Sequence, residues 1–179
     1  MNLPGAAAAA DAGNPACAAA LDFILSVAGH GKHATRLVVA EAPDTAETKD
    51  LTADNILDAG WTGDPPSAAF AAIFLESPAQ SALDSCPSLA AELAKDKIAS
   101  GDDAVAKLTT ADSDVNSLPE FPADVLTVSL PVLSADGLHA LLEYNLCAGV
   151  DMCSGGIQHM LRDKSGRWKR VGRMLSVPS

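Results

Sequence analysis

The pattern of apolar residues divides this chain into a first half with helical spacing and a last third with alternating spacing. Near the start, apolar residues recur on one helix face at Cys17, Leu21, Ile24, Leu25 and Ala28. Asn14 and Pro15 before them are typical of a helix start, because asparagine caps free amides and proline suits the first helical position. Gly29 favours a helix end. These features predict a helix over 14–29.

Shorter apolar clusters follow. Residues 35–41 contain a Leu-Val-Val run and predict a short strand that ends before Pro43. Brief amphipathic clusters predict short helices over 67–75, 87–97 and 102–108. The stretch 109–122 is rich in residues that break regular structure, so we expect a linker there.

From Asp124 the hydrophobic period changes to two, which is typical of half-buried strands. Ala135-Asp136-Gly137 predicts a three-residue hairpin loop in which Gly137 takes the left-handed conformation. If Ser134 faces Leu138, the apolar cross-strand pairs are Leu126 with Leu146, Val128 with Tyr144 and Leu130 with Leu142. Val132 continues the same apolar face. Pro131 requires an edge or a bulge, because proline cannot donate to a strand ladder.

Two further turns complete the expected sheet. One lies between Cys147 and Cys153, and the other is Asp163-Lys164-Ser165-Gly166. The third strand is expected over 157–162 and the fourth over 167–177. Together these segments form an antiparallel β-meander.

The predicted fold class is α+β, with the N-terminal helices packed on one face of a C-terminal four-stranded antiparallel β-meander. An extra strand from Leu37 to Val39 is possible in this arrangement. Residues 1–13 are expected to be a disordered leader. Residues 14–179 are expected to form a single α+β domain, with a helical half over 14–116 and the meander over 124–177.

Composition and charge exclude two classes of protein. The formal charge of -11 argues against a nucleic-acid binder, which needs a positive surface to displace counterions. No run of about 20 apolar residues is present, so no transmembrane segment is expected. Basic residues concentrate near the end of the chain, at Arg162, Lys164, Arg167, Lys169, Arg170 and Arg173. A solvated strand face explains this cluster most simply, and an acidic or protein partner is the alternative.

The chain has four cysteines, and their spacing favours disulfides between Cys147 and Cys153 and between Cys17 and Cys86. Free thiols and a metal site are the alternatives, although the isolated Cys-x₅-Cys spacing does not suit zinc. Disulfides indicate an exported protein, periplasmic or secreted. We expect that a native export signal has been removed from this sequence and that Met1 is a start codon added in its place.

Several short motifs follow one another in the last third. They are VSLPVL at 128–133, Asp136-Gly137, ALLEY at 140–144, the two-cysteine loop 147–156 and GRWK at 166–169. In this order they resemble a family of uncharacterised bacterial exported and lipoprotein-like domains. Those relatives tend to have Cys-Gly-x-x-Cys-Gly-x-Gly, whereas five residues separate the cysteines here. The resemblance implies the order of strands in the sheet and implies no activity, because that family has none assigned.

Four histidines are the remaining candidates for chemistry. His30 and His33 flank Gly31-Lys32 and could share a metal, but cationic side chains at a helix end explain them more simply. His139 and His159 fall on adjacent strands as diagonal neighbours, with Leu141 opposite His159. We expect these two residues on the solvent face of the sheet. With Glu143 they are nonetheless the first candidates for acid–base chemistry.

No motif in the chain defines a reaction. Ser154 lacks the Gly-x-Ser-x-Gly elbow of a serine nucleophile, and no cofactor motif is present. The leading hypothesis is therefore a non-enzymatic exported binding or interaction domain. The alternatives are a small periplasmic hydrolase that uses His139, Glu143 and His159, and a metal-binding protein that uses His30 and His33.

Overall fold

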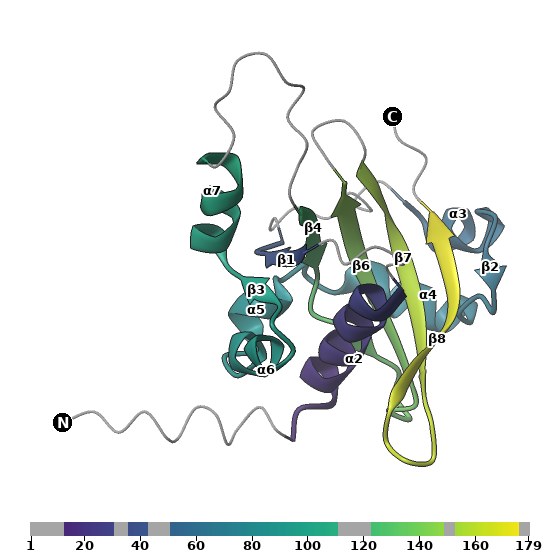
Figure 1. Ribbon diagram of the computed structural model, residues 1–179. Coiled ribbons are helices and arrows are strands. Elements are labelled where there is room, and N and C mark those ends of the chain that lie inside the picture. Colours follow the sequence, from purple (N-terminus) through teal and green to yellow (C-terminus); the bar gives the residue numbers. More distant parts are fainter. Residues whose placement is uncertain (1–12, 31–35, 43–50, 111–122, 149–152, 176–179) are drawn as a thin grey trace.

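The computed structural model describes residues 13–30, 36–42, 51–110, 123–148 and 153–175 (Figure 1). Its helices are α2 (Pro15–His30), α3 (Ala53–Asp58), α4 (Ala68–Glu76), α5 (Ala82–Ser85), α6 (Leu89–Lys95) and α7 (Asp102–Thr110). Its strands are β1 (Arg36–Ala40), β2 (Thr62–Gly63), β3 (Ala99–Ser100), β4 (Ala123–Val128), β5 (Val132–Leu133), β6 (His139–Cys147), β7 (Cys153–Arg162) and β8 (Trp168–Leu175).

Side chains cap the first turns of α2, α3 and α4. At the start of α2, the Asn14 side-chain oxygen accepts a hydrogen bond from the Ala16 amide at 3.0 Å. At the start of α4, the Ser67 hydroxyl accepts from the Phe70 amide at 3.3 Å. The bounds of α2, α4, α6 and α7 agree with the predicted helices to within a few residues. The sequence did not reveal α3, although Thr52 and Asn55 form a capping box there.

The sheet is larger than the predicted meander. Eight strands form one mixed sheet in the order β2-β8-β7-β6-β4-β1-β3, and β5 also pairs with β6. The strands β4, β6, β7 and β8 are antiparallel neighbours, as predicted. The possible extra strand from Leu37 to Val39 is confirmed as β1. The sheet is nevertheless not a four-stranded antiparallel meander, because β1 pairs in parallel with both β4 and β3, and β2 extends the opposite edge.

The register of the first hairpin agrees with the prediction only at its far end. Leu126 lies opposite Leu146 and Val128 opposite Tyr144, as expected. The predicted pair of Leu130 and Leu142 is wrong, because the Leu130 amide donates to the carbonyl of Gln80, at 2.7 Å, instead of to β6.

After residue 130 the chain pairs with β6 again, with the register shifted by one residue. Val132 lies opposite Leu141, so the segment around Pro131 is bulged, as the proline requires. Val132 therefore lies on the other face of the sheet and packs against a second core, not with Val128. Ser134 faces His139 instead of Leu138, which brings its amide to the His139 carbonyl at 2.9 Å. Gly137 takes a φ of 67°, the left-handed conformation that the turn demands.

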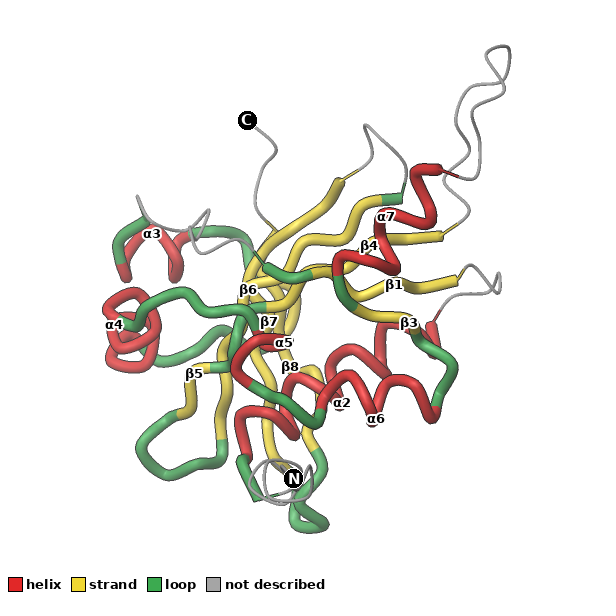
Figure 2. The backbone as a smooth tube through the Cα atoms, turned by 90° about the vertical axis from the view of Figure 1, so that its left-hand side faces the viewer, coloured by secondary structure: helices red, strands yellow, loops and turns green. Residues whose placement is uncertain are grey.

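Helices cover both faces of the sheet, so the prediction of one covered face is wrong (Figure 2). The first core lies between the sheet and α2, α5 and α6, and includes Phe23, Leu93, Leu142 and Met160. The second core lies between the sheet and α3 and α4, and includes Ile56, Phe70, Leu141 and Ile157. The strands carry apolar residues on both faces. Leu142 and Met160 belong to the first core, Leu141 and Ile157 belong to the second, and all four are fully buried.

Some predictions lie outside the described residues. The leader 1–12, most of the linker 109–122 and the loop 149–152 belong to this part of the chain. Among the described helices, none has the length and apolar character that a membrane span requires.

Candidate functional site

Two histidines meet on the face of the sheet that the second core covers. His139 is the first residue of β6, and His159 lies in β7 opposite Leu141, as the register count predicts. Nδ1 of His139 is 3.0 Å from Nε2 of His159. The two rings stack with centroids 5.2 Å apart and planes inclined by 28°. The diagonal placement of the two residues therefore becomes a direct ring-to-ring hydrogen bond.

The protonation of this pair follows from its other partner. Nδ1 of His159 lies 2.9 Å from the backbone carbonyl oxygen of Asp64. A carbonyl oxygen only accepts, so Nδ1 of His159 carries the proton and Nε2 of neutral His159 is the acceptor. Nδ1 of His139 must then donate to it. When both rings are neutral, Nε2 of His139 keeps a lone pair and, within the described residues, has no hydrogen-bond partner.

The expectation that both histidines face solvent is wrong. His159 is only 4% exposed, and His139 is half-buried. The His159 ring makes T-shaped contacts with the rings of Trp61 and Phe70, with ring centroids 6.5 and 6.4 Å away. The indole of Trp61 is held by its own hydrogen bond to the Ile56 carbonyl at 2.7 Å. Side chains from α4 and from the segment after α3 thus cover a position that the strand alone would leave in water.

Burial lowers the pKa of His159, because it disfavours the charged ring. The hydrogen bond to Asp64 opposes this effect, and the neighbouring ring of His139 adds to the lowering. The neutral form of His159 is therefore favoured, and its Nε2 orients the His139 ring by accepting a hydrogen bond from it.

A glycine allows the Asp64 carbonyl to reach the pair. Gly172 lies opposite His159 in β8, and a β-carbon on it would come within 2.0 Å of the Asp64 carbonyl oxygen. The Asp64 amide donates to the Val171 carbonyl at 2.9 Å. Gly63, just before Asp64, has a φ of 90°, which a residue with a side chain rarely adopts. The backbone of Asp64 is therefore held in close contact with β8.

The histidine pair lines a cavity of about 430 Å³. We call it the histidine cavity, and it lies between α4 and the hairpin 134–139. One wall is apolar and comes from the α4 side, with Pro65, Ala69, Phe70 and Ile73. The other wall is polar, with Ser134, Asp136, His139 and His159. Ile73 is 45% exposed and therefore presents apolar surface at the cavity.

The serine and aspartate of the polar wall are already engaged. The Ser134 hydroxyl donates to the Asp136 carboxylate and accepts from the His139 amide at 2.9 Å. The Ser134 hydrogen bond, followed by that of the Leu138 amide, lowers the pKa of Asp136. Asp136 is therefore an anion at neutral pH. The Ser134 hydroxyl stabilises the hairpin through these hydrogen bonds and is not placed to act as a nucleophile.

Glu143 is not brought to the histidine pair. It shares their face of the sheet, opposite Ile157, but lies four residues along β6 from His139, a rise of about 13 Å. Its amide donates to the Ser129 hydroxyl at 2.9 Å, and its side chain does not line the histidine cavity. A site that combines His139, His159 and Glu143 does not follow from this geometry.

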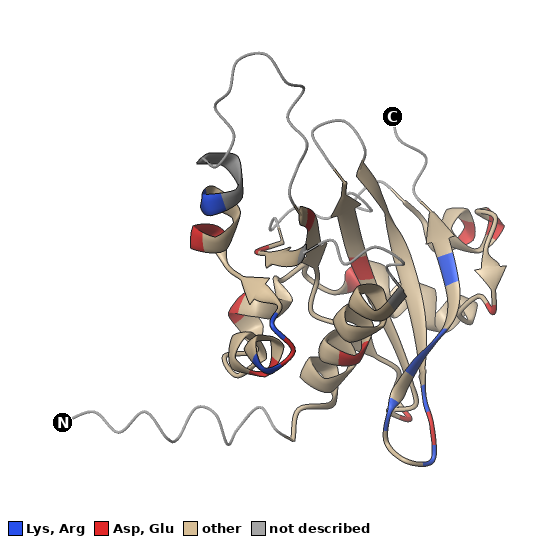
Figure 3. Cartoon of the chain, in the orientation of Figure 1, with Lys and Arg blue, Asp and Glu red and all other residues tan. Residues whose placement is uncertain are grey.

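The basic cluster runs from the β7–β8 turn along β8 (Figure 3), and the contacts of its residues divide it into two groups. At the β7–β8 turn, Lys169 pairs with Asp163 at 2.9 Å, and the Arg162 guanidinium lies 5.9 Å from the centre of the Trp168 ring. Hydrogen bonds from the Ser165 hydroxyl and then from Lys169 hold the pKa of Asp163 far below its ordinary value. Lys164 and Arg167 are exposed at this turn. The second group, Arg170 and Arg173, lies farther along β8.

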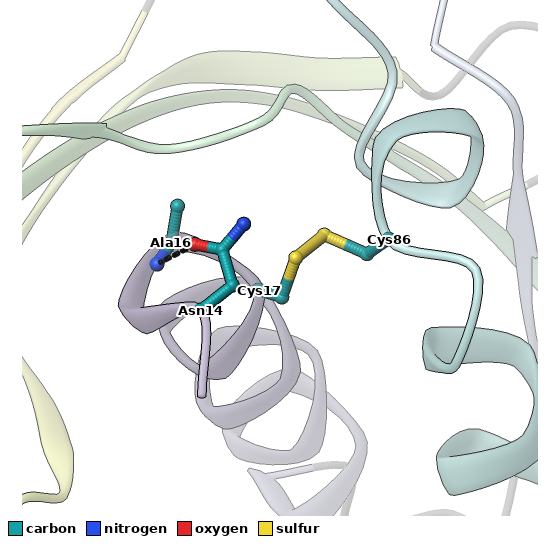
Figure 4. Close-up of a disulfide and its surroundings, with 4 residues drawn as sticks. All are labelled: Asn14, Ala16, Cys17 and Cys86. Carbon is teal, nitrogen blue, oxygen red and sulfur yellow. Dashed lines mark hydrogen bonds between the residues drawn. A yellow bond between two sulfur atoms is a disulfide. The ribbon is translucent and has the colours of Figure 1, made fainter. Parts of the chain in front are cut away.

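Both predicted disulfides are present. Cys17 in α2 is bonded to Cys86, the residue that follows α5, with an S–S distance of 2.08 Å (Figure 4). Cys147 and Cys153 are opposite residues at the ends of β6 and β7. The described part of the chain therefore has no free cysteine.

The predicted metal site at His30 and His33 stays a prediction. His33 and the side chain of His30 lie outside what the structure describes. Among the described residues, no group of three histidines, cysteines or acidic residues is arranged to hold a metal ion. Ser154 is an exposed residue near the start of β7, opposite Leu146.

Comparison with known proteins finds no matching family, no matching curated protein and no matching solved structure. The resemblance to exported bacterial domains stays a prediction from the residues alone. Any functional conclusion depends on the geometry of the site.

Sequence reasoning found the two histidines but missed what surrounds them. Trp61, Asp64 and Phe70 are distant in sequence, and Asp64 acts through its backbone carbonyl, which leaves no signal in the residue type. Gly172 opposite His159 was a usable signal, because a glycine within a strand often marks a close approach of another backbone.

Proposed function

We propose that this chain is an exported, non-enzymatic binding domain that holds a small molecule in the histidine cavity. The observation that carries the proposal is the hydrogen bond from His139 to His159 at 3.0 Å beside an apolar wall. Small-molecule sites are typically mostly apolar concave surfaces with a few fixed polar groups, and they have volumes of about 300–1,000 Å³. The histidine cavity has this composition and a volume of about 430 Å³.

The two walls indicate the chemistry of the ligand. Phe70 and Ile73 suit an aromatic or aliphatic body. Nε2 of neutral His139 suits a hydrogen-bond donor such as a hydroxyl group. Asp136 carries a negative charge at the rim, so an anionic ligand is disfavoured there. We therefore infer a neutral ligand with an apolar body and one donor group.

The two disulfides support an exported location, either periplasmic or secreted. Disulfides persist in oxidising compartments and are rare in the cytosol. The cross-link between Cys17 and Cys86 spans a sequence separation of 69 residues, so it constrains much of the domain. A binding domain of this kind would work outside the cytoplasm.

Calorimetric titration with two matched probes tests the proposal at pH 8. The first probe is 4-ethylphenol, which has an apolar body and a donor hydroxyl. The second is 4-ethylanisole, in which a methyl ether removes the donor. We expect saturable binding of 4-ethylphenol that is at least about fivefold tighter than that of 4-ethylanisole, since a hydrogen bond typically contributes about 1 kcal/mol or more in a buried site.

The variant His139→Phe keeps an aromatic ring in place and removes the acceptor. It should reduce the preference for 4-ethylphenol over 4-ethylanisole to about twofold or less. Lys164→Ala, at the β7–β8 turn, is the control and should keep the full preference. Absence of saturable binding for both probes, or an unchanged preference in His139→Phe, contradicts the proposal.

A small hydrolase is the second candidate function. It is favoured by the same fixed proton arrangement, because Nε2 of His139 could accept a proton from water while His159 orients the ring. Hydrolysis of 4-nitrophenyl acetate provides the test. A rate that falls to background in His139→Phe and is unchanged in Glu143→Gln supports a histidine base without a contribution from Glu143. A background rate in the unmodified protein removes this candidate.

A further inference from the structure

A β-bulge in β8 places two arginines on the same face of the sheet. Arg170 pairs with Met160 and Arg173 pairs with Gln158, whereas Gly172 pairs with His159. The register shifts between His159 and Met160, so Val171 is the extra residue of the bulge. Residues three apart in a regular strand point to opposite faces. Because of the bulge, Arg170 and Arg173 both lie on the face of Gln158 and Met160.

This face is the one that α2 covers, on the opposite side of the sheet from the histidine cavity. Arg170 lies with its guanidinium 5.7 Å from the centre of the Phe23 ring in α2. Arg173 pairs with Thr62 of the edge strand β2 and is exposed. A shallow cavity of about 330 Å³ is lined by both arginines together with Thr62 and Gln158.

A buried glutamine fixes the first arginine. Gln158 is only 1% exposed, and its side-chain amide donates to the carbonyl oxygens of His159 and Gly172. Its side-chain oxygen is thereby turned toward Arg170 and accepts from Nε of that arginine at 3.0 Å. Among the described residues, no hydrogen bond engages the terminal nitrogens of this guanidinium.

In the part of the chain that the structure describes, no carboxylate balances the charges of the two arginines. Within the described residues, neither arginine forms an ion pair with a carboxylate. Burial lowers the pKa of Arg170, and the nearby positive charge of Arg173 lowers it further, while Tyr144 opposes both effects. A half-buried charge normally has an opposite charge beside it. Here two like charges are held together in a chain whose formal net charge is -11.

We propose that Arg170, Arg173 and Gln158 form a binding site for an oxyanion group, a phosphate or a carboxylate, of a small molecule. The guanidinium group presents donors in a planar fork that matches two oxygens of such a group. Arg170 forms the inner, oriented side of the site and Arg173 the outer side, opposite Thr62 of β2. The bulge at Val171 is the structural device that brings them together.

This site is independent of the histidine cavity, because the two lie on opposite faces of the sheet and are lined by different residues. Binding of an anion here does not require binding of a phenol there. The two proposals therefore succeed or fail separately.

Titration of the protein with sodium phosphate, sodium acetate and sodium chloride at constant ionic strength tests the proposal. The measurement follows the Nε–H resonance of Arg170 and the side-chain amide of Gln158 by NMR. We expect saturable shifts of both signals with phosphate or acetate and none with chloride. The stronger of the two oxyanions identifies the group that the site prefers.

The variant Arg173→Gln should weaken that binding at least tenfold. Arg173 is exposed, so this change should leave the fold intact. Lys164→Gln removes the same charge at the β7–β8 turn and should leave the affinity within twofold. Shifts that do not saturate, or an equal loss of affinity in Lys164→Gln, would show that only the general field of the basic strand acts, and would overturn the proposal.

Discussion

The α-carbon of Gly172 lies directly beneath the backbone of Asp64, at a distance that no side chain could occupy. A β-carbon at position 172 would come within 2.0 Å of the Asp64 carbonyl oxygen. That same oxygen accepts the Nδ1 proton of His159 at 2.9 Å. Because Gly172 has no side chain, the Asp64 carbonyl can reach His159 and determines that Nδ1 of that ring carries the proton.

Replacing Gly172 with alanine should therefore disturb the histidine pair from the opposite strand. The added methyl group must displace the Asp64 carbonyl, and the buried Nδ1 proton of His159 then loses its acceptor. A buried donor without a partner typically costs about 1–3 kcal/mol. We expect the free energy of unfolding in urea to fall by at least this amount.

Gly60→Ala is the matched control for this substitution. No atom lies within 4 Å of the position that its β-carbon would take. Its free energy of unfolding should stay within about 0.5 kcal/mol of that of the unmodified protein. Equal stabilities of the Gly172→Ala and Gly60→Ala variants would mean that the close approach of Asp64 is not maintained in solution.

Stability should decrease as the pH falls below about 6.5, the ordinary pKa of histidine. Burial lowers the pKa of His159 in the folded state, so the unfolded chain takes up a proton at this position first. The contribution is fully present above pH 6.5 and is lost as the pH falls through the lowered folded-state pKa. Asp136 and Asp163, whose pKa values are also lowered, add a second loss below about 3.8.

Urea unfolding between pH 7.5 and pH 5.0 provides the measurement. The variant His159→Gln removes the titrating ring and should show a smaller decrease in stability over this range. The difference between the two proteins isolates His159 from the other histidines. An identical pH dependence in both would contradict the assignment of His159 as a buried neutral ring.

The two disulfides should differ in their contributions to stability. The sequence separation is 69 residues for Cys17–Cys86 and 6 residues for Cys147–Cys153. Loop-closure entropy predicts a loss of about 4 kcal/mol for the double variant C17A/C86A and about 2 kcal/mol for C147A/C153A. Urea unfolding of the two variants gives the comparison, and a larger loss in C147A/C153A would be inconsistent with this account.

The part of the fold that the sequence predicts well is local. Alternation fixes the pairing of Leu126 with Leu146 and of Val128 with Tyr144, since a one-residue slip would expose the apolar face. The cysteine pairs follow from spacing. Pro131 indicated an edge or a bulge, but the sequence did not show where the register changes. That position depends on a hydrogen bond from the Leu130 amide to Gln80, which is distant in the sequence.

The part that the sequence does not predict is the assembly of distant segments. The parallel pairing of β1 with β4 and the two-residue strands β2 and β3 leave no periodic signal. The helix over 67–75 was predicted, but the face of the sheet that it covers was not. For this reason His159 was expected in solvent, and its burial by Phe70 and Trp61 emerges only from the structure.

The central claim is that His159 fixes His139 with an acceptor nitrogen directed to a ligand. The most direct test is a long-range ¹H–¹⁵N NMR spectrum of both rings at pH 8, recorded with and without 4-ethylphenol. We predict that Nδ1 is protonated and Nε2 unprotonated in each ring, and that only Nε2 of His139 shifts toward a hydrogen-bonded value on titration. A proton on Nε2 of His139 in the free protein, or no shift of that nitrogen with the phenol, would contradict the account.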